Sequence, residues 1–345
     1  MTVALSILDL ADVGEDETVA DALHASVALA EAAEELGYRR VWYAEHHNMT
    51  SIASAATSVL IAHVAAHTAT IRLGAGGIML PNHAPLTIAE QFGTLATLHP
   101  GRIDLGLGRA PGSDQATFRA LRRDHAAADR FPEDVLELQG YLSGPSRVPG
   151  VEATPGRGTD VPLYILGSSL FGAQLAAALG LPYAFASHFA PQALQQAVAT
   201  YRHGFRPSAQ LDAPHVIAAV NVIAADDHAE AERELLATKR RRARLLFGRD
   251  RTLTTADLDA VLASPAGQQV EQMVRYTAAG TIEQVETYLA WFTEHADADE
   301  LILASAGTSR GARLRSLELV AQAYGLTRRT DPAAQRVPGA GQPSG

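Results

Sequence analysis

The chain has 345 residues, of which 47% are hydrophobic and 19% charged, so it is long enough to bury a large core. Its formal net charge of −10 argues against a nucleic-acid partner, because no excess of basic side chains is available to neutralise phosphates. With no cysteine, the chain has no disulfides, thiolate nucleophiles or thiolate metal ligands. It has no basic start followed by an apolar run and no apolar stretch of membrane-spanning length, so we expect a cytoplasmic protein with no membrane partner.

Strand and helix patterns alternate along the chain. Short apolar runs without helical periodicity predict strands over residues 3–8, 40–44, 71–78, 103–108, 162–166, 183–186, 215–223 and 300–304. The segments between them predict helices over residues 18–36, 53–66, 85–98, 131–142, 170–179, 191–205, 281–294 and 312–324, with a charged helix that begins at 227. Residues 252–279 look like a helical insertion. Residues 329–345, rich in Pro, Gly, Gln and Ala, predict a flexible, disordered tail after a domain over 1–328.

Eight strands, each followed by a helix, predict a single-domain α/β fold with insertions, the (β/α)8 TIM barrel. An open doubly wound sheet is the alternative fold, but it usually has fewer strands and a glycine-rich nucleotide fingerprint after the first strand. Here the first strand leads into residues 9–12, with only Gly14 nearby. The barrel is therefore the favoured fold.

The carboxyl ends of the predicted strands carry unusual side chains, and in a barrel these ends form one rim. Three ionisable residues, Glu45, His46 and His47, directly follow the second strand. They indicate a catalytic loop, and a solvated loop without a catalytic role is the alternative. Further candidates are the Gly76–Gly77 pair in the third strand, residues 108–112 after the fourth, residues 167–172 after the fifth and residues 187–189 after the sixth. Five such features on one rim predict an active site there.

An anion site is predicted where the fifth strand meets its helix. Ser168, Ser169 and Gly172 open that helix with small residues, so its free N–H groups and dipole favour an anion; ordinary N-capping by a serine is the alternative. Arg109, at the end of the neighbouring strand, would clamp the same anion. Together they indicate a phosphate. The glycines within the third strand indicate a close approach of backbone to a planar ligand or a strained peptide.

Other kinds of site do not match the sequence. His63 and His67 have zincin spacing but lack the general-base Glu between them, so we predict no metal site. Residues 167–171 lack the second glycine of a nucleophile elbow, and residues 106–108 lack the third glycine of a dinucleotide fingerprint. The basic run at 239–244 predicts the cationic end of an amphipathic helix, with an anion-binding patch as the alternative.

The rim motifs together resemble those of the bacterial luciferase-like flavin-dependent monooxygenases. The resemblance lies in residues 42–47, 74–81, 99–109, 166–169 and 180–182, and it is dense over residues 1–190. It implies a (β/α)8 barrel that binds reduced FMN at the carboxyl rim and uses O2. By matching position, the FMN phosphate would be held by Arg109, Ser168, Ser169 and Gly172. Gly76 and Gly77 would lie against the isoalloxazine, where the family often has a non-proline cis peptide. His46 would be the active-site histidine, with His47 and Glu45 supporting it.

One departure from the family pattern is Gly108, because true luciferases carry a reactive cysteine at the matching position. The chain therefore resembles a non-luminescent relative that receives FMNH2 from a separate flavin reductase and forms a homodimer. The leading hypothesis is a two-component monooxygenase that hydroxylates or epoxidises a small, largely apolar organic substrate, as in a tailoring step of secondary metabolism such as antibiotic biosynthesis. The alternatives are a deazaflavin-dependent oxidoreductase on the same barrel and a non-catalytic flavin-binding relative.

Overall fold

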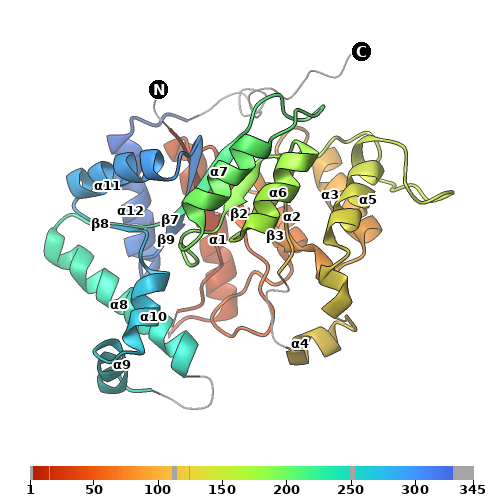
Figure 1. Cartoon of the computed structure of the whole chain (residues 1–345). Helices are drawn as coiled ribbons and strands as arrows, with labels where there is room; N and C mark the ends of the chain where they lie inside the picture. Colours follow the sequence, from red (N-terminus) through yellow and green to blue (C-terminus); the bar gives the residue numbers. More distant parts are fainter. Residues whose placement is uncertain (1–2, 15, 111–114, 124, 249–252, 329–345) are drawn as a thin grey trace.

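The computed structural model describes residues 3–14, 16–110, 115–123, 125–248 and 253–328, and the predicted tail at 329–345 lies outside these ranges. Parallel strands form a central barrel and helices surround it (Figure 1). The strands are β1 (Ala4–Asp9), β2 (Arg40–Tyr43), β3 (Arg72–Met79), β4 (Ile103–Gly108), β5 (Leu163–Gly167), β6 (Tyr183–Phe185), β7 (Val216–Ala224), β8 (Thr277–Gly280) and β9 (Glu300–Ser305). The eight strands predicted from the sequence all form.

The barrel closes through consecutive parallel pairings from β1 to β7, followed by β7 with β9 and β9 with β1. The eight barrel strands are therefore β1–β7 and β9, which confirms the predicted (β/α)8 fold. Among the described helices, none is both long enough and apolar enough to cross a membrane.

The helices begin and end close to the predicted positions. They are α1 (Val19–Leu36), α2 (Thr57–Ala65), α3 (Pro85–Leu98), α4 (Gln115–Ala120), α5 (Phe131–Ser143), α6 (Leu170–Leu179), α7 (Leu194–Gly204), α8 (His228–Phe247), α9 (Thr255–Leu262), α10 (Gly267–Met273), α11 (Ile282–His295) and α12 (Arg310–Ala323). Thr18 caps α1 by accepting a hydrogen bond from the N–H of Asp21, and Gly37 ends it with φ of 86°. α4 lies between β4 and α5, where no helix was predicted.

The segment predicted as a helical insertion contains a strand, which corrects the prediction. After α9 and α10, β8 pairs with residues 221–224 of β7, beyond the residues at 216–218 that pair with β6. β6 is three residues long, so β8 takes over the free edge of β7 near the rim. Its four small residues, TAAG, lack the alternation of apolar and polar side chains that would predict a strand. In Figure 1, α4, α9 and α10 lie at the lower end of the barrel, around the carboxyl ends of the strands.

A buried charge network fills the amino-terminal half of the barrel. Arg40 lies between Asp104, at 2.7 Å, and Glu300, at 2.9 Å, and all three side chains are buried. Arg40 also donates to the hydroxyl of Tyr164 at 2.7 Å, and Trp42 donates its indole N–H to Asp104 at 3.1 Å. Because these groups satisfy one another, the amino-terminal half of the barrel is filled, and the carboxyl end is left for a ligand.

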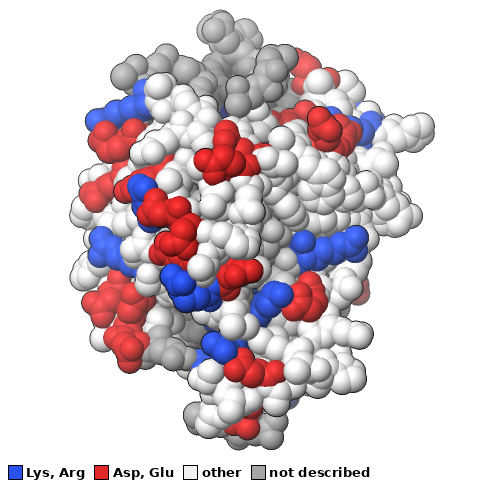
Figure 2. All heavy atoms as spheres, turned by 90° about the vertical axis from the view of Figure 1, so that its left-hand side faces the viewer, with Lys and Arg blue, Asp and Glu red and all other residues white. Residues whose placement is uncertain are grey.

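On the outside, the charges are dispersed. Figure 2 shows acidic and basic side chains interspersed on the face formed by the left-hand side of Figure 1. Arg240 of α8 pairs with Asp259 of α9 at 2.7 Å, and Lys239 pairs with Glu271 of α10 at 2.8 Å. The basic run is thus part of a helix, as predicted, but it lies well inside α8, and its outward members are neutralised by the insertion.

Candidate active site

Glu45 is the buried centre of a hydrogen-bond cluster at the rim. It follows β2, is 1% exposed and accepts from the N–H of Met79 at 2.8 Å. Asn82 donates to it at 3.0 Å, and ring nitrogens of His47 and His83 lie 2.8 and 3.0 Å away. Burial raises the pKa of Glu45, but the hydrogen bonds from His83, Asn82 and Met79 outweigh burial, so the pKa lies below its usual value. Glu45 is therefore a carboxylate that fixes the end of β2 to the loop after β3.

His46 makes no hydrogen bond with that cluster. Its Nδ1 is buried, and no described group forms a hydrogen bond with it. Burial lowers the pKa of His46 more than the carboxylates of Glu45 and Asp12 raise it. A neutral imidazole with an unsatisfied buried nitrogen is suited to meet a ligand, because an unmade buried hydrogen bond is costly.

A second histidine, His188, shares this environment. It follows β6, its side chain is 7% exposed, and its Nδ1 is also buried without a partner. Burial lowers the pKa of His188 to about 3, and the positive charges of Arg242 and His46 act in the same direction. The backbone is fixed by Asn221 of β7, whose side chain donates to the carbonyl of His188 at 2.7 Å. His188 is thus a neutral, rigidly placed side chain on the same rim as His46.

Arg109 reaches the helix that begins after β5. Its guanidinium carbon lies 4.1 Å from the ring centroid of Phe171, in the first turn of α6. Ser169 is the N-cap residue by backbone conformation, yet its side chain accepts no capping hydrogen bond, so the capping alternative is not what Ser169 does. A cation next to the free N–H groups of a helix N-terminus is the arrangement that holds a phosphate.

The Gly76–Gly77 peptide is cis, and the pairing of β3 with β4 shifts register between Ala75 and Ile78. A Cβ on Gly76 would lie 2.8 Å from the Cβ of Trp42, and one on Gly77 would lie 2.7 Å from the carbonyl oxygen of Gly106. The need for glycine therefore has a cause inside the barrel wall. A second role against a flavin ring stays a prediction.

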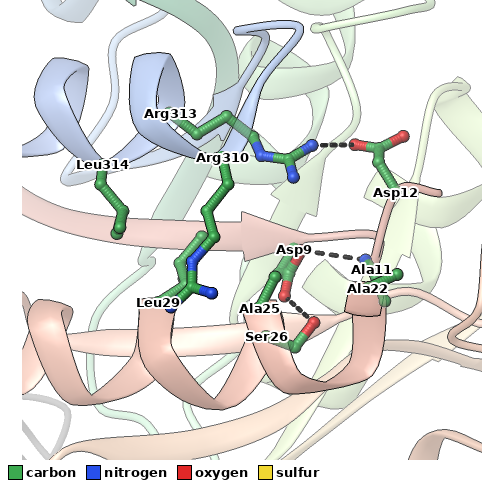
Figure 3. Close-up of a pocket in the computed structure, with 10 residues that line it drawn as sticks. All are labelled: Asp9, Ala11, Asp12, Ala22, Ala25, Ser26, Leu29, Arg310, Arg313 and Leu314. Carbon is green, nitrogen blue, oxygen red and sulfur yellow. Dashed lines mark hydrogen bonds and ion pairs between the residues drawn. The ribbon is translucent and has the colours of Figure 1, made fainter. Parts of the chain in front are cut away.

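The loop after β1 completes the rim (Figure 3). Asp9 accepts from the hydroxyl of Ser26 at 2.5 Å and from the N–H of Ala11 at 2.9 Å. Asp12 extends from this loop and lies 4.0 Å from Arg313 of α12 and 3.4 Å from Arg241 of α8. The small cavity of about 10 Å³ beside Asp9 holds at most one water molecule, so it is no substrate pocket.

The structure groups the predicted site residues in two places. Glu45, His46 and His47 follow β2, where the N–H of Glu45 donates to the carbonyl of Gly77, of the Gly76–Gly77 pair, at 3.2 Å. Arg109 lies against Phe171 in the first turn of α6, the helix that Ser168 and Ser169 precede and that contains Gly172. His63 on α2 and His67, in the turn that follows it, are exposed neighbours with ring centroids 4.7 Å apart. No group of metal-binding side chains occurs among the described residues.

Sequence reasoning missed two side chains of the rim, His83 and Arg242, and it named residues 187–189 as a rim feature without giving His188 a role. His83 lies far from Glu45 along the chain, and Arg242 looks like one member of a basic run. For His188 a signal was available, because it directly follows the sixth strand. His188 and Arg242 are distinguished by a buried side-chain nitrogen, Nδ1 and Nε respectively, that has no hydrogen-bond partner, and only the fold reveals this.

Comparison with known proteins gives a family. The sequence model of the luciferase-like monooxygenases matches residues 3–324. A "Luciferase-like monooxygenase" of Escherichia coli (strain K12) is 48% identical over 321 residues, which cover 92% of this chain and 96% of that protein. An "N-acetyl-S-alkylcysteine monooxygenase" of Bacillus subtilis (strain 168) is 42% identical over 195 residues, 53% of this chain and 57% of that protein.

Comparison with solved structures supports the same family. The structure of apo-MsnO8 superposes with a TM-score of 0.86 at 36% identity, and the match covers 95% of this chain and 99% of that one. Two others, at 16% and 14% identity, share the fold alone: a type II Baeyer-Villiger monooxygenase in complex with FMN and an F420-dependent secondary alcohol dehydrogenase, each with a TM-score of 0.68. The motifs at the strand ends predict a barrel and a flavin-dependent monooxygenase, and both predictions are confirmed. The chain belongs to the luciferase-like monooxygenase family.

Proposed function

We propose that this protein is the oxygenase of a two-component system that takes FMNH2 from a separate flavin reductase and uses O2 to hydroxylate or epoxidise a small organic substrate. The observation that carries the proposal is the stacking of Arg109 on Phe171, which sets a cation beside the N-terminus of α6. A phosphate there would place the attached ring toward the rim, where His46 and His188 have unsatisfied nitrogens.

The residues fit FMN in charge and in space. Arg109 would bind the phosphate with the hydroxyls of Ser168 and Ser169 and the N–H of Gly172. Gly172 is buried in the first turn of α6, where an added Cβ would be in van der Waals contact with Tyr183 at 3.4 Å, so this turn is closely packed behind its N–H groups. Bound FMNH2 would supply the electrons that activate O2 for insertion of one oxygen atom into the substrate.

The chain's own side chains would control protons and water at this rim. His46, neutral because burial lowers its pKa, would donate or accept a hydrogen bond at the reacting end of the cofactor. The Glu45 cluster would hold the backbone of the His46 loop, with His47 locked onto the carboxylate at 2.8 Å. His188, equally neutral, would line the opposite wall and exclude water.

The name of one relative suggests a candidate class of substrate. The Bacillus subtilis relative is named for N-acetyl-S-alkylcysteines, which are thioethers with a carboxylate, so we include such thioethers among the candidates. We extend the proposal to a tailoring step in secondary metabolism. Deletion of the gene should then cause the unoxidised precursor to accumulate in a metabolite profile, and an unchanged profile would contradict that role.

We also propose a homodimer that packs helices of the first half of the barrel. Val59 on α2 and Leu98 on α3 are 69% and 66% exposed, which supports burial against a second copy. Light scattering should give twice the monomer mass, and a monomeric Val59→Glu variant would locate the interface. A monomer at micromolar concentration would contradict the proposal.

The experiment that tests the cofactor uses reduced FMN and reduced F420 in parallel. Free FMNH2 releases hydrogen peroxide at once when it meets O2, so an oxygenase that shields the flavin from water should delay that release. We expect tight binding of FMNH2, delayed peroxide release and weak binding of F420. Preference for F420 would support the deazaflavin alternative instead, and FMN binding with no effect on the reaction with O2 would support a non-catalytic flavin-binding protein.

A further inference from the structure

Arg242 differs from the other basic residues of its run on α8. Each of its neighbours in the run is engaged: Lys239 with Glu271, Arg240 with Asp259, Arg241 with Asp12 and Arg244 with a partner of its own. Among the described residues, none forms an ion pair or a hydrogen bond with Arg242, and its Nε is buried. Arg242 is partly buried, and a buried guanidinium nitrogen without a partner is unusual, because burial costs a charged group its hydration.

Arg242 belongs electrostatically to the mouth of the barrel. Its positive charge lowers the pKa of both His46, after β2, and His188, after β6. All three side chains have a buried nitrogen without a hydrogen-bond partner, and they come from three different elements around the rim. His188 is 7% exposed, so its free Nδ1 faces protein or an enclosed space rather than bulk water.

The carboxylates around this cluster are already occupied. Asp12 acts on Arg242 but pairs with Arg241 at 3.4 Å and lies 4.0 Å from Arg313. Glu45 acts on His46, yet it accepts from His47, His83, Asn82 and the N–H of Met79. The cluster thus combines one permanent positive charge and two neutral imidazoles without an anion of its own.

We propose that Arg242 binds a carboxylate of the substrate at the mouth of the barrel, on the side where the buried nitrogens of His46 and His188 lack partners. This inference rests on the proposed function, since it takes the mouth of the barrel as the place where substrate meets the flavin. A guanidinium binds a carboxylate through two parallel hydrogen bonds, which fixes orientation as well as position. The substrate is then an organic acid, oxidised at an atom that the bound carboxylate orients toward His46.

The test compares a carboxylate with a neutral ligand of the same shape. Binding of N-acetyl-S-benzylcysteine and of its carboxamide is measured by calorimetry, with and without bound FMN. The proteins are the wild type, Arg242→Gln, Arg242→Lys and the control Arg240→Gln, which removes the same charge from the same helix at a side chain that pairs with Asp259.

We expect the wild type and Arg240→Gln to bind the carboxylate about 10–100-fold more tightly than the carboxamide, as a charge-assisted hydrogen bond allows. Arg242→Gln should lose this preference and keep its affinity for the carboxamide, while Arg242→Lys should keep part of it. In NMR spectra, Arg242→Gln should also raise the pKa of His46, which shows that the variant is folded and that the charge lies where we place it. Equal binding of both ligands by the wild type, failure of the carboxylate to bind, or an unchanged preference in Arg242→Gln would overturn the proposal.

One further arm separates this inference from the proposed function. If Arg242→Gln weakens FMN but leaves riboflavin binding unchanged, Arg242 binds the flavin phosphate and the inference is wrong, although the protein remains a flavin enzyme. If neither protein binds FMN but both show the expected ligand preferences, the carboxylate site stands and the FMN proposal fails.

Discussion

Arg109 stacks on Phe171 with its guanidinium carbon 4.1 Å from the ring centroid, and this contact joins the end of β4 to the first turn of α6. Within the part of the chain that the structure describes, no group forms a hydrogen bond with the guanidinium of Arg109, so its N–H groups can meet a ligand at the edge of the stack. The charge is thereby pre-positioned beside the helix N-terminus, and a bound phosphate would not have to order a flexible side chain.

Glu45→Gln should destabilise the fold, because an amide cannot accept all the hydrogen bonds that the carboxylate now accepts. We expect a loss of about 1–3 kcal/mol in the free energy of unfolding, the cost of leaving buried donors unsatisfied. Urea denaturation measures it. Glu152→Gln is the control, because Glu152 is exposed and pairs with the exposed Arg157. Equal losses in both variants would show that the Glu45 cluster contributes nothing special.

The imidazole of His188 should stay neutral throughout the range in which the protein is folded. Burial, then Arg242 and His46, lower its pKa from 6.5 to about 3, so the unfolded chain binds a proton there that the folded protein does not. The contribution to stability is present above pH 6.5 and is lost as pH falls toward 3, with a slope of about 1.4 kcal/mol per pH unit at most. His188→Gln should lack this part of the slope. An NMR titration of the His188 ring with a midpoint near 6.5 would contradict the account.

Gly77→Ala should destabilise the barrel wall, because the added Cβ would lie 2.7 Å from the carbonyl oxygen of Gly106. Overpacking of this kind costs about 1–3 kcal/mol. Thermal unfolding without flavin measures the loss. The control is Gly144→Ala, where nothing lies within 4 Å of the added atom. If Gly77→Ala is as stable as the control but loses flavin binding, the glycine serves the ligand alone.

His46→Ala should uncouple the reaction while leaving the fold and FMN binding nearly intact, since the residue follows a strand and makes no hydrogen bond through Nδ1. Product formation should fall by about 10²–10⁴, the usual effect of removing a positioned acid or base. Hydrogen peroxide should rise by the amount that product falls. His63→Ala, on the exposed face of α2, should behave as the wild type, and unchanged coupling in His46→Ala would remove the residue from the mechanism.

The fold was largely predictable because local signals agree with the tertiary structure. β4 and α3 have the predicted bounds, since Pro85 starts the helix and the Pro100–Gly101 turn separates it from the strand. β8 was not predictable, because four small residues gain strand structure only from the free edge of β7.

The candidate site was predictable in part. Glu45, His46 and Arg109 stand out because each follows a strand directly, and strand ends gather at one rim. Arg242 does not stand out, because its neighbours are equally basic and only the fold shows which of them lack an acidic partner. Because the sequence does not single out Arg242, it predicts a largely apolar substrate. The guanidinium of Arg242, which no described residue pairs with, instead supports our proposal of a substrate that carries an acid group.

The central claim, that this rim binds FMN through a phosphate site at Arg109, is tested most directly by the affinities of wild type and Arg109→Ala for FMN and riboflavin. Riboflavin lacks the phosphate but keeps the ring. The account predicts that Arg109→Ala binds FMN more weakly by about 1.5–3 kcal/mol, the contribution of a charge-assisted hydrogen bond, while riboflavin binding is unchanged. Arg157→Ala, which removes an exposed arginine that pairs with Glu152, should bind both ligands as the wild type does. An equal loss for FMN and riboflavin in Arg109→Ala, or no loss for FMN, would contradict the claim.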